Sequence, residues 1–171
     1  MPESAPAAML PFRRVGPKPT LHRAGLNTPT GPFWVEAEEG AIVRAGWGDA
    51  PAFTDNPVLQ QALSEISAYF AGRLTAFTVP LRPKVSGFQA TFLQALIGIR
   101  FGETRTNGQL AKFLNTPAQA IGQACGANPV PLLIPCHRVL GATSLGGYSG
   151  AGRVETKVAL LRHEGAGGLL L

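Results

Sequence analysis

Apolar and polar residues alternate in the first third of the chain, and this pattern predicts β-strands. The alternating apolar positions are Phe33, Val35 and Ala37. Recurrence at every second residue is the period of a strand with one buried face. Turn-forming residues at 28–32 and 39–40 interrupt residues 21–47. We therefore expect this segment to form strands joined by turns.

Helical periodicity begins after Asn56. Asn is a favourable helix cap, Pro57 suits a first helical turn, and Gly72 can end the helix. The apolar residues at helical spacing are Leu59, Leu63, Ile66 and Phe70. Residues 20–79 contain no chemistry-bearing motif, so we expect an α/β scaffold domain there. Residues 1–19, rich in Pro and Ala without periodicity, are expected to form a loose tail.

The second half of the chain predicts three short helices after a Pro-containing connector at 78–84. Each helix is preceded by a hydroxyl residue with Gln three positions later, the capping-box pattern. The three pairs are Ser86 and Gln89, Thr106 and Gln109, and Thr116 and Gln119. The expected core residues are Phe88, Phe92, Leu96 and either Ile99 or Ile97 in the first helix, and Leu110, Phe113 and Leu114 in the second.

The second and third of these helices, joined by a short link at 115–117, are typical of a helix-turn-helix unit. The third helix, at about residues 117–125, is rich in Ala and Gly and has few side chains that could contact base edges. Such a helix can lie close to the sugar-phosphate backbone in a narrow groove. Small residues suit a plain helix packing face equally well, so spacing alone leaves both interpretations open.

Cys136 stands in an unusual setting for a cysteine. The apolar run 132–134 predicts a short buried strand, which Pro135 ends. Cys136 is then expected where the chain leaves the core and can meet a substrate. Formation of its thiolate would depend on nearby positive charge or a base, and His137 and Arg138 follow directly. The alternative is a buried cysteine that packs as a small apolar side chain.

Charge is unevenly distributed along the chain, whose formal net charge is +5. Residues 1–79 hold six Lys and Arg against seven Asp and Glu, whereas residues 80–171 hold nine against three. The half that contains Cys136 is therefore the basic half. Such a surface attracts a polyanion such as DNA, although charge alone also fits a merely solvated basic surface.

The cysteine and histidine counts exclude other classes of site. Cys125 and Cys136 are too few for a disulfide framework and suit a reducing cytosol. The three histidines are far apart and give no zinc-ligand spacing. No apolar run reaches the length of a membrane helix, and the N-terminus lacks a signal-peptide pattern. We expect a cytoplasmic protein without a metal site.

Residues 134–139, Ile-Pro-Cys-His-Arg-Val, resemble the active-site signature of the O6-alkylguanine-DNA alkyltransferases. The resemblance runs over residues 86–165, with further matching blocks, in the family's order, at 102–105, 126–129, 145–148 and 160–165. It implies an α/β (α+β) fold with a small N-terminal strand-and-helix domain. Residues 80–171 would form a helical domain with a winged-helix-like, helix-turn-helix DNA-binding unit and the alkyltransferase site.

The resemblance also implies a reaction. An alkyl group such as methyl would pass irreversibly from O6 of guanine in DNA, with O4 of thymine as a second candidate, to Cys136. His137 would take the thiol proton through a bound water and Glu164 would orient the imidazole, the nucleophile–base–orienter arrangement of catalytic triads. The protein would be consumed in one turnover without a cofactor. It would act as a cytoplasmic, nucleoid-associated monomer.

The family binds its damaged base from the minor groove, flipped out of the duplex. The contacts implied for this chain are Thr106, Asn107, Gln119, Gly122, Asn128, Pro131, Arg138, Val139, Tyr148 and Ser149. Two positions depart from the family. Tyrosine, which helps rotate the nucleotide, is usual at Asn107, and arginine, which fills the gap left by the flipped base, is usual at Gln119. These departures predict poorer extraction of a base from duplex DNA with the thiol chemistry intact.

Two other functions remain to be weighed. An alkyltransferase-like protein would sense lesions and recruit other repair, but such relatives typically lack the reactive cysteine, so Cys136 argues against this class. A Cys-His hydrolase would need an oxyanion hole and turnover, and no separate signature in the chain supports it.

Overall fold

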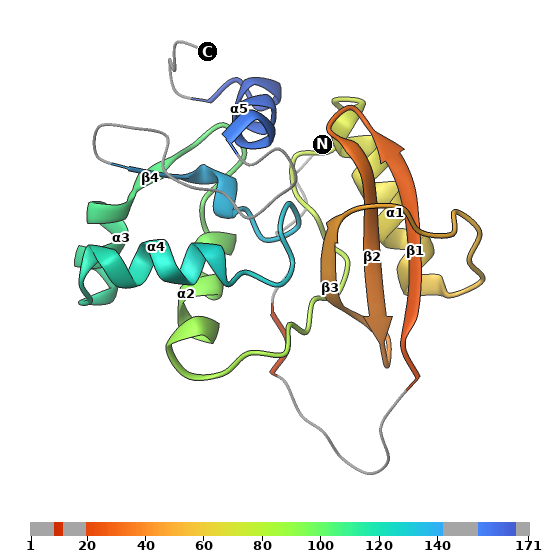
Figure 1. Ribbon diagram of the computed structural model, residues 1–171, viewed down its shortest axis with the longest axis horizontal. Coiled ribbons are helices and arrows are strands. Elements are labelled where there is room, and N and C mark those ends of the chain that lie inside the picture. The colour runs from red at the N-terminus through yellow and green to blue at the C-terminus, as the bar shows by residue number, and fades with distance from the viewer. Residues whose placement is uncertain (1–8, 12–19, 142–153, 167–171) are drawn as a thin grey trace. The chain divides into compact units, whose positions relative to one another are not determined.

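The computed structural model describes residues 9–11, 20–141 and 154–166 (Figure 1). The chain divides into two compact units, Met1–Ser86 and Gly87–Leu171, called here the N-terminal and C-terminal units. Residues 80–86, which the sequence placed with the second half, lie in the N-terminal unit. None of the helices in the described ranges is both long enough and apolar enough to span a membrane.

The N-terminal unit is built on an antiparallel sheet of three strands. These are β1 (His22–Thr28), β2 (Gly31–Glu38) and β3 (Ala41–Trp47), in the order β1-β2-β3. The alternating residues Phe33, Val35 and Ala37 of β2 are all buried, as their spacing predicts. Tight turns at 29–30 and 39–40 connect the strands, so the predicted strand-and-turn pattern is confirmed.

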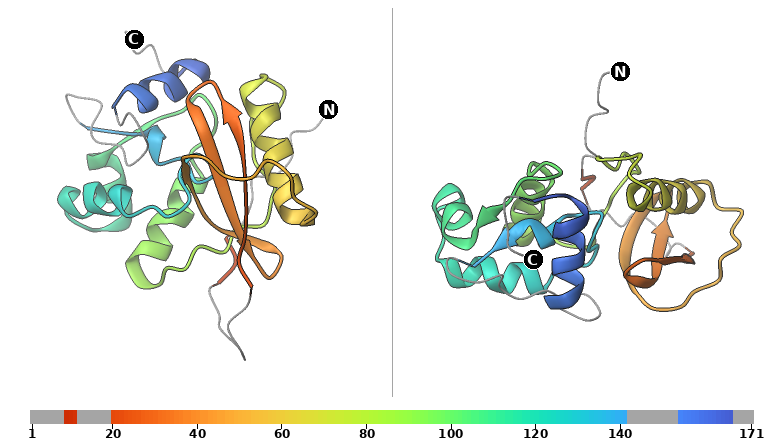
Figure 2. Two further views of the ribbon diagram at one scale, coloured as in Figure 1. Left: turned by 45° about the vertical axis from the view of Figure 1, so that its right-hand side comes forward. Right: turned by 90° about the horizontal axis from the view of Figure 1, so that it is seen from above.

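Helix α1 (Pro57–Phe70) lies along one face of this sheet and contacts all three strands (Figure 2). Its predicted cap is present, because Asn56 Oδ1 accepts hydrogen bonds from the backbone N–H groups of Val58 and Leu59 at 3.1 and 3.2 Å. The buried stripe differs slightly from the prediction. It consists of Val58, Leu59, Ala62, Ile66 and Tyr69, with Leu63 and Phe70 only half-buried.

The C-terminal unit is mainly helical. Its elements are α2 (Gly87–Ile97), β4 (Arg105–Thr106), α3 (Asn107–Leu114), α4 (Ala118–Gly126), the 3-10 helix η1 (Cys136–Arg138), β5 (Val139–Leu140) and α5 (Val154–His163). Strands β4 and β5 pair in parallel, with Arg105 opposite Val139 and Thr106 opposite Leu140. This pair joins the residues before α3 directly to those that follow Cys136.

Helices α3 and α4 form the predicted pair, but their ends differ from the sequence pattern. Thr106 and Gln109 make a complete capping box at the start of α3. The box predicted at Thr116 is wrong, because α4 begins after Pro117, which caps it without a side-chain hydrogen bond. Asn115 adopts a left-handed conformation, with φ of 53°, and ends α3.

Core assignments in these helices are partly wrong. Ile99, rather than Ile97, is fully buried after α2, together with Phe92, Leu93 and Leu96. Phe113 is 75% exposed and Phe88 is also exposed, although both were expected in the core. In α3 the buried positions are Leu110 and Ala111, because the neighbouring helix covers only this narrow face of a helix two turns long.

The segment before Cys136 is a turn and not the predicted strand. Residues 132–134 are buried as expected, but Leu132 has a φ of 73° and the backbone N–H of Ile134 donates to the carbonyl of Val130 at 3.0 Å. A strand needs a ladder of neighbouring backbone groups. The carbonyl of Ile134 instead accepts its hydrogen bond from the side chain of Asn128.

The two threonines offer a matched test of the capping geometry. We expect Thr106→Ala to lower the free energy of unfolding of the C-terminal unit by about 1 kcal/mol, since it removes a side-chain cap. Thr116→Ala should have a much smaller effect, because Thr116 does not cap α4. Urea denaturation of both variants measures the difference. Equal losses would contradict the asymmetry of the two helix starts.

Candidate active site

Cys136 is the first residue of η1 and is held in a tight backbone turn. Its N–H donates to the carbonyl of Ile134 at 2.8 Å, and the N–H of Arg138 donates to the carbonyl of Pro135 at 3.1 Å. The cysteine is only 2% exposed. The expectation that the chain leaves the core at this point is therefore wrong, because η1 keeps residues 136–138 inside. The thiol lies in a protein interior, where neighbouring charges act on it strongly.

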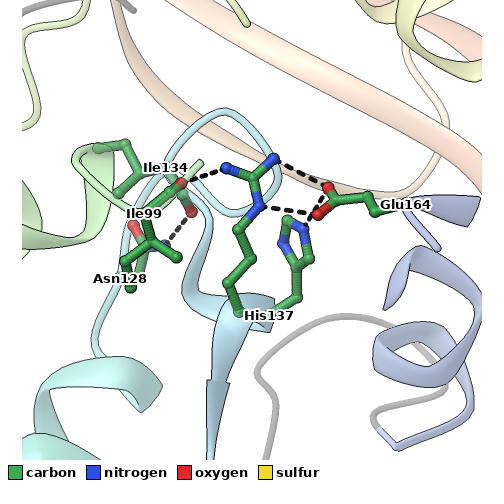
Figure 3. Close-up of polar contacts among 6 residues, drawn as sticks. Ile99, Asn128, Ile134, His137 and Glu164 are labelled. Atoms are coloured by element: carbon green, nitrogen blue, oxygen red, sulfur yellow. Dashed lines mark hydrogen bonds and ion pairs between the residues drawn. The ribbon is translucent and has the colours of Figure 1, made fainter. Parts of the chain in front are cut away.

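The structure brings His137 and Glu164 together from positions 27 residues apart. Their side chains are fully buried and point toward one another, with His137 Nε2 2.8 Å from Glu164 Oε2 (Figure 3). Because an ionised carboxylate only accepts hydrogen bonds, Nε2 carries the proton. The other ring nitrogen, Nδ1, is then the one that can accept a proton.

The charge states of this pair follow from burial and from their neighbours. Burial lowers the pKa of His137, and the attraction of Glu164 opposes this shift, while the charges of Arg138 and Lys157 add to it. Burial alone would raise the pKa of Glu164, but the hydrogen bonds from His137 and Arg138 and the positive charge of Arg138 outweigh it and hold the pKa far below its usual range. A neutral imidazole therefore faces an ionised carboxylate near neutral pH.

Arg138 is buried beside this pair rather than exposed toward a ligand. Its Nε donates to Glu164 Oε1 at 2.8 Å and its Nη2 donates to Oε2 at 2.9 Å, a two-pronged ion pair. Its Nη1 donates to the backbone carbonyl of Ile99. All three donor groups named here are thus used within the protein, and the contact to DNA or base expected for Arg138 stays a prediction.

Lys157 of α5 belongs to the same site, and the sequence did not single it out. The residue is 1% exposed and its Nζ donates to the carbonyl of Val139. Burial lowers its pKa, while attraction to the thiols of Cys125 and Cys136 raises it. Lys157, Leu160, Leu161 and Glu164 are buried at helical spacing, and that repeat could have revealed it.

Asn128 connects the end of α4 to the turn that holds Cys136. The residue is buried, its Nδ2 donates to the carbonyl of Ile134 at 3.0 Å, and its Oδ1 accepts from the N–H of Val130 at 3.0 Å. Both bonds replace partners that a regular strand would supply. Pro131 and Val139, also predicted as site residues, are buried in the same stretch of chain.

The remaining predicted contacts lie on α3 and α4. Thr106 and Asn107 are half-buried at the start of α3, whereas Gln119 and Gly122 are exposed on α4. Residues 118, 119, 122, 123 and 126 form one exposed face of α4. No acidic residue occurs in α3 or α4. Tyr148 and Ser149 lie outside the described residues.

The thiol of Cys125 lacks the low pKa that a nucleophilic cysteine requires. It is half-buried on α4, and burial together with the charge of Cys136 raises its pKa to about 12, although Lys157 opposes the shift. Its thiol is therefore protonated near neutral pH, and only a thiolate is nucleophilic. Among the described residues, no group of three His, Cys, Asp or Glu side chains could hold a metal ion.

The lowered pKa values predict how stability depends on pH. The unfolded chain binds protons on His137 below about pH 6.5 and on Glu164 below about pH 4.5, whereas the folded chain resists both, so stability falls as the pH falls. Glu164→Gln leaves Arg138 without its partner and should cost roughly 3–5 kcal/mol near pH 7. The difference in the free energy of unfolding between this variant and the unaltered protein should narrow toward about pH 3, because the ionised carboxylate contributes less stability as the pH falls.

Urea denaturation of both proteins across this pH range measures the narrowing. Glu155→Gln is the matched control, because Glu155 is exposed in the first turn of α5. Its stability should run nearly parallel to that of the unaltered protein. A Glu164→Gln curve that also stays parallel down to about pH 3 would show that the carboxylate is not held ionised by its neighbours.

Comparison with known proteins gives a consistent assignment. Residues 21–83 match the family described as 6-O-methylguanine DNA methyltransferase, ribonuclease-like domain, and residues 87–166 match its DNA binding domain. A methylated-DNA–protein-cysteine methyltransferase of Mycobacterium leprae is 34% identical over 160 residues, which cover 84% of this chain and 92% of the relative. One from Methanosarcina acetivorans is 42% identical over 157 residues, covering 85% and 99%.

Solved structures agree with the sequence matches. The crystal structure of Mycobacterium tuberculosis OGT in complex with DNA is similar with a TM-score of 0.74 and 34% identity, covering 84% of this chain and 92% of that one. A structure of Mycobacterium tuberculosis O6-methylguanine methyltransferase has the same TM-score at 32% identity, covering 88% and 98%. With both units matched in sequence and in fold, the chain belongs to the 6-O-methylguanine DNA methyltransferase family.

Proposed function

We propose that this protein repairs DNA by irreversible transfer of an alkyl group, methyl above all, from O6 of guanine to Sγ of Cys136. The observation that carries the proposal is the buried hydrogen bond between His137, the residue after Cys136, and Glu164. His137, next in the chain, is neutral and directs Nε2 at the ionised carboxylate of Glu164. Relatives of similar length that bear the name methylated-DNA–protein-cysteine methyltransferase support the same reaction.

The proposed reaction is a displacement at carbon. Nδ1 of His137 takes the thiol proton through a water molecule, and the Cys136 thiolate attacks the alkyl carbon. The bond from carbon to O6 breaks as the bond from carbon to sulfur forms, and the departing guanine takes up a proton. The displacement needs neither an oxidant nor a reductant. Since the thioether is not cleaved, each molecule reacts once.

Binding of DNA is proposed to use the helix pair α3 and α4. The exposed face of α4 carries Gln119, Gly122, Gln123 and Gly126, so the helix backbone can approach a groove closely. The surplus of Lys and Arg in residues 80–171 supplies the attraction to phosphates. The base is flipped out from the minor groove toward Cys136, and one monomer acts on one lesion.

A lesion-sensing function without transfer is the second candidate. Asn107 and Gln119 favour it, because neither can replace the aromatic ring and the arginine that assist base extraction in relatives. Cys136 and its buried neighbours argue for transfer, since a sensor has no need of an ionised Glu164 against a neutral His137.

The first prediction from the proposed function concerns the residue that accepts the alkyl group. Incubation with O6-benzylguanine should add one benzyl group per chain, located on Cys136 by peptide mapping and intact mass analysis. Cys136→Ala should abolish the adduct, and Cys125→Ala should retain it, because the Cys125 thiol stays protonated. An adduct on Cys125, or continued reaction of Cys136→Ala, would refute the assignment. An unmodified protein would instead favour the sensing function.

The second prediction separates base extraction from displacement. Gln119→Arg combined with Asn107→Tyr should raise the rate with duplex DNA containing O6-methylguanine, roughly tenfold if each residue contributes about 0.7 kcal/mol to extraction. The rate with free O6-benzylguanine should change less than about twofold, because neither residue belongs to the buried site. Gel-based single-turnover assays measure both rates. Equal gains on the two substrates would contradict the division of roles.

A further inference from the structure

Arg138 donates two hydrogen bonds to the Glu164 carboxylate. Oε1 accepts from Arg138 Nε at 2.8 Å, and Oε2 accepts both from Arg138 Nη2 at 2.9 Å and from His137 Nε2 at 2.8 Å. Arg138 is itself fixed at its far end by the carbonyl of Ile99. The guanidinium therefore has little freedom to rotate, and it determines where the carboxylate presents Oε2 to the histidine.

Arg138 also determines what the carboxylate does to the imidazole. A buried carboxylate alone beside a histidine would bind a proton with it, either on its own oxygen or on the ring. Both outcomes remove the base that the thiol needs. With the positive charge of Arg138 against it, Glu164 stays ionised without drawing a proton onto His137. Lys157 of α5 is a further charged group that acts on the ring, and its positive charge also lowers the pKa of His137.

We propose that Arg138 is a positioning residue, which fixes the Glu164 carboxylate against the His137 ring and so keeps the ring able to accept the Cys136 proton. The proposal rests on the proposed alkyl transfer. It assigns Arg138 to the chemistry of the buried site rather than to contact with DNA. Arg138 therefore matters even for a substrate that carries no phosphate.

The test uses free O6-benzylguanine, so that DNA binding plays no part. The rate of Cys136 alkylation is measured from about pH 5.5 to about pH 9 for Arg138→Gln and Arg138→Lys. In Arg138→Gln the unshielded carboxylate should move the acid limb of the profile upward by about one pH unit. The rate near pH 5.5, at the acid end of the range, should then fall by up to about tenfold and largely recover near pH 9. Arg138→Lys keeps the charge but not the two-pronged geometry, so its shift should be smaller.

Three controls distinguish positioning from general damage. Arg162→Gln removes an exposed arginine of α5 and should leave the profile unchanged. In a Glu164→Gln background, Arg138→Gln should cause a much smaller shift, since the carboxylate through which it acts is absent. Circular dichroism checks folding. Where Arg138→Gln does not fold, Arg138→Lys carries the test.

NMR titration of the His137 ring gives a readout independent of activity. The ring, or the pair it forms with Glu164, should bind its proton at a higher pH in the Arg138 variants than in the unaltered protein. Unshifted titration and an unshifted pH profile in folded variants would overturn the role of Arg138 while leaving alkyl transfer intact. A wild-type protein that is not alkylated at Cys136 would overturn the proposed function, and the NMR shift would still decide the role of Arg138.

Discussion

The C-terminal unit depends on one buried carboxylate. Glu164 lies beyond the end of α5, and its two oxygens bind His137 and Arg138 of η1. An isolated charge in a protein interior costs several kcal/mol, whereas a carboxylate with three charge-assisted or polar hydrogen bonds is tolerated. The segment that carries Cys136 and the last helix can therefore reach their places only together. Arg138 also donates to the carbonyl of Ile99, so the same network of hydrogen bonds includes the residues that follow α2 in the chain.

Lys157 is buried near the thiol of Cys136, and attraction to this thiol raises the pKa of Lys157. By the same attraction, the positive charge of Lys157 favours the ionised form of the thiol, so the two charges compensate each other. In a low-dielectric interior this compensation matters more than the total charge of the protein surface. Lys157 further holds the carbonyl of Val139, so the turn that aims the sulfur and the charge that acts on it are coupled.

Local patterns were a good guide where local interactions decide the structure. The alternation around Phe33 and the cap at Asn56 each predicted the element that forms, because a strand face and a helix start are specified by neighbouring residues. The turn at 132–134 was predicted as a strand, since its apolar letters do not reveal that Asn128 supplies its hydrogen bond. The burial of Arg138 and of Lys157 was likewise not predicted. A charged residue is expected to be exposed until its buried partners are known, and here those partners lie 18 and 26 positions away along the chain.

The C-terminal unit contains two groups of residues whose substitution lowers its stability by different amounts. Asn107 is half-buried at the start of α3 and Gln119 is exposed on α4, and neither belongs to the buried contacts around Glu164. Arg138 and Glu164 form a buried ion pair, where loss of one leaves the charge of the other unpaired, and loss of Lys157 removes a buried hydrogen bond to the carbonyl of Val139. Asn128 is the link between the two regions, since it joins the end of α4 to the turn of Cys136. The surface of α3 and α4 that we propose to bind DNA can therefore diverge while the buried arrangement around Glu164 is preserved, because only the second is enforced by the stability of the fold itself.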